Sequence, residues 1–185
     1  MEYLAVGARC LIGVVFLASF ISKVVSRAAF EAFVDSIGDM RLLPAVLVKT
    51  AAVIVVVTEC AVFLLLAVPT PLTAVTGFVA AAIMLTVFGV GILSVIRRGV
   101  RASCQCFGRS TAPLGLRHVL RNVVLVSAAT VGAVTTMLMA PAQGWTAAVA
   151  VAGGLVMGGL VIMFDDIVML FRPVDESLDS VHSVR

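Results

Sequence analysis

Apolar residues in this chain form long, nearly continuous runs separated by short polar segments. The runs cover residues 3–25, 45–68, 72–96, 119–140 and 145–164. Each has about the ~20 residues that a helix needs to cross the hydrocarbon core of a bilayer. They lack the alternation of barrel strands, and only helices or closed barrels satisfy backbone polar groups inside lipid. The pattern therefore predicts an all-α, polytopic transmembrane bundle with four to five spanning helices.

The segment between the first two runs has a helical pattern of its own. Its apolar residues Phe30, Phe33, Val34 and Ile37 recur at helical spacing, and acidic residues lie between them. A helix with one apolar and one charged face is typical of a membrane interface. We therefore expect a short interfacial amphipathic helix, followed by Pro44 at the start of the second span.

Composition agrees with this pattern. Hydrophobic residues make up 62% of the 185 residues and charged residues 12%, far from the values of soluble domains. The first run begins with Met1-Glu2 and no basic segment, so we expect a retained helix instead of a cleaved signal peptide. We predict one transmembrane domain over residues 1–172 and a short, polar, disordered tail over residues 173–185.

Lysine and arginine gather in the first and third predicted loops and are absent from the other connections. The basic residues are Lys23, Arg27, Arg41 and Lys49 in the first loop, and Arg97, Arg98, Arg101, Arg109, Arg117 and Arg121 in or beside the third. Short basic loops stay in the cytoplasm. We therefore expect a multi-pass protein of the plasma membrane with its N-terminus outside and its C-terminus in the cytoplasm. The net charge of +3 reflects topology, and no nucleic-acid partner is expected.

Arg9 and Glu59 fall inside predicted spans, where an unpaired charge is costly. At 1.5 Å of rise per residue, both lie roughly 9–14 Å from the outer surface. We predict an ion pair between them, which either fixes the two helices or lines a substrate or proton path. The adjacent Cys10 and Cys60 would lie at similar depth, as inert core residues or as a second thiol pair.

The most polar stretch, RRGVRASCQCFGRS at residues 97–110, contains Cys104 and Cys106. Thiolate is the reactive form of cysteine and nearby positive charge stabilises it, so Arg101 and Arg109 should activate this pair. A disulfide between residues two apart closes a small strained ring, and strained disulfides exchange readily. The segment therefore predicts thiol–disulfide exchange.

A metal site is the chemical alternative for these cysteines. Cys104, Cys106 and His118 would supply three ligands, but a recognisable fourth ligand and the usual Cys-X-X-Cys spacing are missing from the sequence. We expect no metal. The sequence specifies no cofactor, although a quinone would provide a route for electrons from the thiol pair.

Together these positions resemble the MauE family of methylamine utilisation proteins, within the broader DoxX-like membrane proteins. The resemblance covers about residues 5–140 and rests on Arg9, Ser22-Lys23, Phe30, Phe33, Leu43-Pro44, Glu59, Cys104-Gln105-Cys106-Phe107-Gly108 and Arg121-Asn122. It implies a redox-associated membrane protein that supports maturation of a disulfide-rich exported protein. On this resemblance Phe107, Gly108, Arg121 and Asn122 support the cysteine pair. The family often has glycine where this chain has Gln105.

Three functions remain open. The first is a thiol–disulfide redox protein, the second a noncatalytic assembly or export factor, and the third a small-molecule or proton transporter centred on Glu59. An exported client matures outside, whereas the arginines place Cys104 and Cys106 inside. Three explanations stay open: the cysteine segment folds back into the bundle, the pair exchanges with cytoplasmic thiols and passes electrons to a quinone or to Cys10 and Cys60, or the link to the client is indirect, through its export or stabilisation. Expected partners are membrane lipid and either a thiol-redox partner or an exported client. Gly154 and Gly158, four residues apart, would permit oligomer formation.

Overall fold

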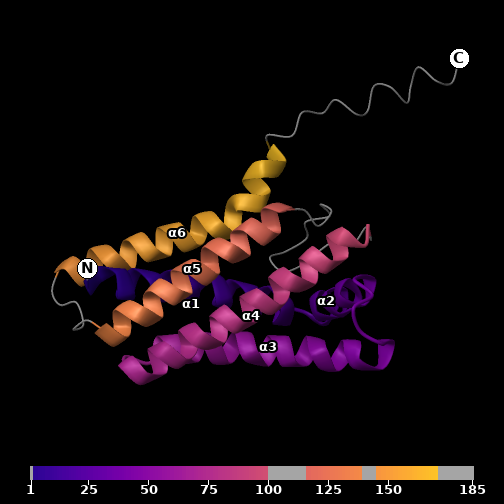
Figure 1. Cartoon of the computed structure of the whole chain (residues 1–185), viewed down its shortest axis with the longest axis horizontal. Coiled ribbons are helices and arrows are strands. Elements are labelled where there is room, and N and C mark those ends of the chain that lie inside the picture. The colour runs from indigo at the N-terminus through magenta and orange to yellow at the C-terminus, as the bar shows by residue number, and fades with distance from the viewer. Residues whose placement is uncertain (1, 100–115, 139–144, 171–185) are drawn as a thin grey trace, which may run out of the picture.

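The computed structural model describes residues 2–99, 116–138 and 145–170. Within these ranges the regular elements are helices: α1 (Glu2–Val24), α2 (Arg27–Asp39), α3 (Ala45–Ala67), α4 (Pro71–Arg97), α5 (Leu116–Leu138) and α6 (Trp145–Leu170) (Figure 1). The predicted all-α class is confirmed, and the apolar runs coincide with the long helices.

Four helices in the described ranges, α1, α3, α4 and α5, are long and apolar enough to cross a membrane. The described apolar part of α6, Ala147–Met163, is shorter. Large apolar side chains on the outside of the bundle, such as Val46 at 87% exposure and Leu72 at 75%, suit contact with lipid. The prediction of a multi-pass bundle with four to five spans is therefore confirmed.

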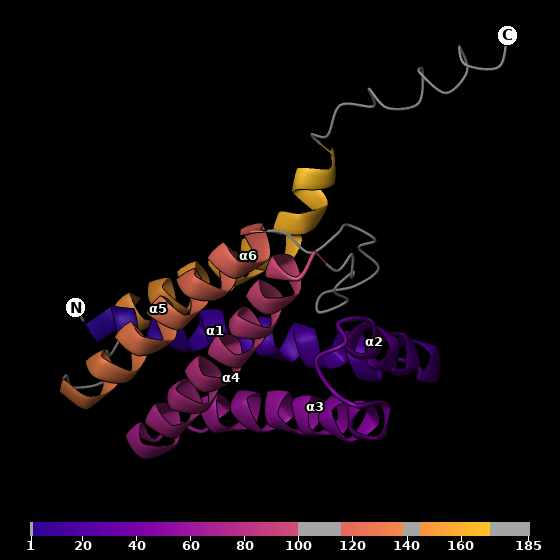
Figure 2. The same cartoon turned by 45° about the vertical axis from the view of Figure 1, so that its right-hand side comes forward.

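Helix α1 is central to the arrangement, because it packs against α3, α5 and α6, while α4 packs against α3 and α5. The start of α1 lies at the end of the bundle where α3 is followed by α4 (Figures 1 and 2). At the opposite end, α2 lies beside the end of α1 and the start of α3. The C-terminal end of α4 and the start of α5 also lie at that opposite end.

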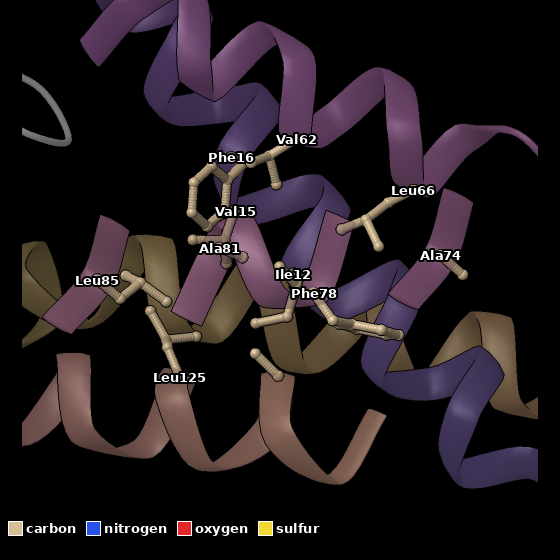
Figure 3. Packing of buried hydrophobic residues seen from close by; sticks show 11 residues of the cluster. Ile12, Val15, Phe16, Val62, Leu66, Ala74, Phe78, Ala81, Leu85 and Leu125 are labelled. Carbon is tan, nitrogen blue, oxygen red and sulfur yellow. The ribbon is translucent and has the colours of Figure 1, made fainter. Parts of the chain in front are cut away.

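One apolar core joins the spanning helices. Buried residues of α1, α3, α4 and α5 meet in it, among them Ile12, Phe16, Val62, Phe78 and Leu125 (Figure 3). Phe78 is fully buried against α5, where a Cβ added to Gly132 would lie 2.5 Å from Phe78 Cζ. Glycine at position 132 thus provides the space that the Phe78 ring occupies.

Helices α1 and α6 approach each other through small residues. A Cβ on Gly154 would lie 2.4 Å from the Gly7 carbonyl oxygen, and one on Gly158 would lie 2.1 Å from Val14 Cγ1. Gly154 and Gly158 therefore pack against α1 of the same chain, which is one of the two roles that their spacing permits. Small residues four apart permit close helix packing both within one chain and between two copies, so their spacing alone did not distinguish these two arrangements.

The predicted amphipathic helix is α2. Ser26 caps its N-terminus by accepting a hydrogen bond from the Ala29 amide at 3.1 Å. Its apolar side, with Phe33 and Ile37 buried, packs against Val48 and Ala52 of α3. The other side of α2 exposes its charged residues, as an interfacial helix requires.

Candidate functional site

A buried ion pair joins α1 to α3 near the end of the bundle that carries α2. Lys23 Nζ lies 2.7 Å from Glu59 Oε1 and 3.0 Å from Oε2. Lys23 is 1% exposed and Glu59 4% exposed. The Ser19 hydroxyl donates to Glu59 Oε1 at 2.8 Å. The two charges neutralise each other where neither could be hydrated.

The predicted pair between Arg9 and Glu59 is wrong. The Arg9 guanidinium instead donates to the carbonyl oxygens of Leu66 and Val68, at the C-terminal end of α3. The prediction aligned the helices by their ends, whereas α1 is staggered so that Arg9 lies at the level of the last turn of α3. Glu59, about two turns deeper in α3, therefore faces Ser19 instead of Arg9.

Lys23 reaches Glu59 because side chains on a helix lean toward its N-terminus. Its ammonium group runs back along α1 and donates to the Ser19 carbonyl oxygen at 3.0 Å and to the Ser19 hydroxyl oxygen at 2.7 Å. The Phe33 ring of α2 lies 4.8 Å from Lys23 Nζ, measured to the ring centroid. Lys23 therefore connects α1, α2 and α3.

Sequence reasoning missed this role of Lys23, which it counted among the basic residues of the first loop and used in the family resemblance without assigning it a buried partner. Lys23 instead belongs to the last turn of α1. A signal was present, because Ser19 and Lys23 are four residues apart and so share a face of an apolar helix. Two polar residues on one such face indicate a buried partner on a neighbouring helix.

A pocket of about 600 Å³ opens beside this pair, between the end of α1, α2 and the first turns of α3. Lys23, Arg27, Glu31, Asp35 and Lys49 are the charged residues on its wall. The pocket therefore borders the buried pair on the Lys23 side.

The predicted redox residues Cys104 and Cys106 lie outside the described residues, as do Arg101, Phe107, Gly108 and Arg109. The helices on either side of that segment are described, however. A Cβ on Gly91 of α4 would lie 3.4 Å from Leu42 Cδ1, so the last turns of α4 pack beside the connection from α2 to α3. The segment after α4 therefore starts at the end of the bundle that holds Lys23.

The supporting residues Arg121 and Asn122 lie early in α5, close to the same end. Asn122 is 7% exposed, and a Cβ on Gly89 of α4 would lie 3.8 Å from Asn122 Cβ. His118, one turn earlier, is also buried. Among the residues that the structure describes, no cluster of metal-ligating side chains occurs.

The second cysteine pair lies in the spanning helices. Cys10 and Cys60 are free thiols in half-buried positions. Cys10 lies against α6, since a Cβ on Gly154 would lie 2.8 Å from Cys10 Cβ.

Comparison with known proteins places this geometry in a family. The model of the family described as methylamine utilisation protein MauE matches residues 1–135, which include α1 to α4, most of α5 and the cysteine pair. The chain belongs to the MauE family. A MauE relative, the methylamine utilization protein MauE of Paracoccus denitrificans, is 34% identical over 143 residues, covering 76% of this chain and 69% of the relative. No solved structure matches the chain. The resemblance predicted from the sequence is thus confirmed.

Proposed function

We propose that this MauE protein is a membrane thiol–disulfide redox protein whose exchanging pair is Cys104 and Cys106. The observation that carries the proposal is the arginine-flanked Cys-X-Cys sequence in the connection between α4 and α5. Nearby arginines favour the thiolate, which is the form that attacks a disulfide. The process that the pair serves is the maturation of an exported protein, as the family resemblance implies.

The chemistry is a two-electron exchange. A thiolate of a partner attacks the Cys104–Cys106 disulfide and forms a mixed disulfide with one cysteine. The partner's second thiolate then attacks that bond, so that the partner leaves oxidised and this chain keeps two thiols. A quinone-class carrier in the membrane restores the disulfide by taking up two electrons and two protons.

We also propose that the N-terminus lies outside and the C-terminus lies in the cytoplasm, in the plasma membrane. The basic loops support this orientation. The start of α1 and the end of α6 lie at opposite ends of the bundle, as an odd number of spans requires (Figure 1). The cysteine pair then lies at the cytoplasmic side, so its link to an exported client is indirect, through export or stabilisation of that client.

A transport function centred on Glu59 gains no support from the site. The Glu59 carboxylate is neutralised by Lys23 and accepts a hydrogen bond from Ser19. These contacts explain why a carboxylate can be buried at position 59, and the explanation requires no transported ligand.

The full-length protein, purified in detergent, tests the redox proposal. It is equilibrated in glutathione buffers of stepped potential, quenched with acid and alkylated, and its thiols are counted by mass. We expect one two-electron couple in the natural sequence and in C10S/C60S, and its loss in C104S/C106S. A couple that persists in C104S/C106S, or the absence of any couple, would contradict the proposal.

A further inference from the structure

The pocket beside Lys23 has a wall of mixed charge. Apart from Lys23, its charged residues are Arg27, Glu31, Asp35 and Lys49, and all four are exposed. Because Glu59 already neutralises Lys23, the rest of the wall offers two positive and two negative groups. A ligand that complements this wall carries both a negative and a positive group.

The same pocket also has apolar walls. Val24, Phe30 and Val34 line it together with the charged residues. It lies where α1 ends and α3 begins, beside the ends of two helices that are long and apolar enough to cross a membrane. Val25 and Val46, at 71% and 87% exposure, present further apolar surface there. A zwitterion dissolved in water does not require apolar contacts, whereas an amphiphile does.

A second pocket adjoins the first along α2. It has a volume of about 650 Å³, shares Val34, Asp35 and Lys49 with the first and extends to Asp39 and Arg41. The two pockets together form a groove between α2 and α3 that holds charges of both signs along its length.

We propose that this groove binds the headgroup of a phospholipid with a primary amine, of the phosphatidylethanolamine class. Arg27 and Lys49 bind the phosphate, and Glu31 and Asp35 accept hydrogen bonds from the ammonium group. Phe30 and Val34 contact the glycerol and the first methylene groups. A quaternary amine lacks N–H donors, so a choline lipid satisfies the two carboxylates less well.

Native mass spectrometry of the full-length protein tests this site. The protein is released from micelles that contain equal amounts of phosphatidylethanolamine, phosphatidylcholine and phosphatidylglycerol. We expect preferential retention of phosphatidylethanolamine, a reduction of about tenfold in R27Q/K49Q, and loss of the preference over phosphatidylglycerol in E31Q/D35N.

The control variant R97Q/R98Q removes two exposed cations at the same end of the bundle but outside the pocket, and we expect it to retain lipid as the natural sequence does. Thermal unfolding in detergent confirms that each variant is folded. Equal retention of the three lipids by the natural sequence, or equal losses in R97Q/R98Q and R27Q/K49Q, would overturn the proposal. Displacement by free phosphoethanolamine at the same concentration as the lipid would overturn it too, because the ligand would then be a soluble headgroup.

Discussion

Lys23 and Glu59 show how two charges can be buried together in a helical bundle. Each alone would be expensive in a low-dielectric interior. Their separation of 2.7 Å and the hydrogen bonds with Ser19 compensate much of the loss of hydration. The pair also fixes the stagger of α1 against α3, because it forms in only one register.

This pair predicts a strong asymmetry between single and double substitutions. K23M or E59M leaves the other charged group buried without its partner and should lower the free energy of unfolding by about 3 kcal/mol. K23M/E59M removes both charges and should lose clearly less than the sum of the single losses. Denaturant unfolding in micelles measures these values, and simple additivity would contradict the coupling.

Arg9 makes a second connection between the same helices. Its guanidinium donates to the carbonyl of Leu66 in the last turn of α3 and to that of Val68, the C-cap residue, whose carbonyl also accepts from the Thr70 amide at 2.9 Å. We expect R9M to lower the free energy of unfolding by about 2 kcal/mol and R9K to lose less, because lysine restores one of the bonds. R97M, at an exposed position, is the control in the same unfolding assay. An R9M loss no larger than that of R97M would rule out this role.

At the scale of helices, glycines decide how closely α6 lies on α1. A Cβ on Gly154 or Gly158 would overlap α1, whereas Gly153 and Gly159 have nothing within 4 Å of such a Cβ. G154A and G158A should therefore each destabilise the bundle by about 1–3 kcal/mol. G153A and G159A should be neutral, or stabilise by up to about 1 kcal/mol through helix propensity. Thermal unfolding of the four variants provides the comparison, and equal effects at the four sites would contradict this packing.

The helices themselves were predictable because membrane spans and an amphipathic helix leave periodic signals in the sequence. The stagger of α1 against α3 could not be predicted from the sequence, since it depends on side-chain packing between the helices. For that reason Arg9 and Glu59 were matched by depth, although Lys23 is the partner of Glu59. Lys23 was further obscured because a lysine at the end of a span also serves as a topology signal.

For the whole molecule, the proposed orientation in the membrane rests on the basic loops. Single cysteines can be introduced into a variant in which all four natural cysteines are serine. T70C places one between α3 and α4, and S26C places one between α1 and α2. We expect a membrane-impermeant maleimide to label T70C in intact cells and S26C only after lysis. The reverse labelling would show the opposite orientation.

The central claim concerns Cys104 and Cys106, whose reactivity was predicted from the arginines around them. Thiol trapping in intact cells tests it most directly: acid quench, alkylation with a mass-tagged maleimide, and comparison with C104S and C106S. We predict a mixture of disulfide and dithiol that shifts when respiration is blocked, with C10S/C60S behaving as the natural sequence does. Thiols at positions 104 and 106 that stay fully reduced in every condition would contradict the redox function.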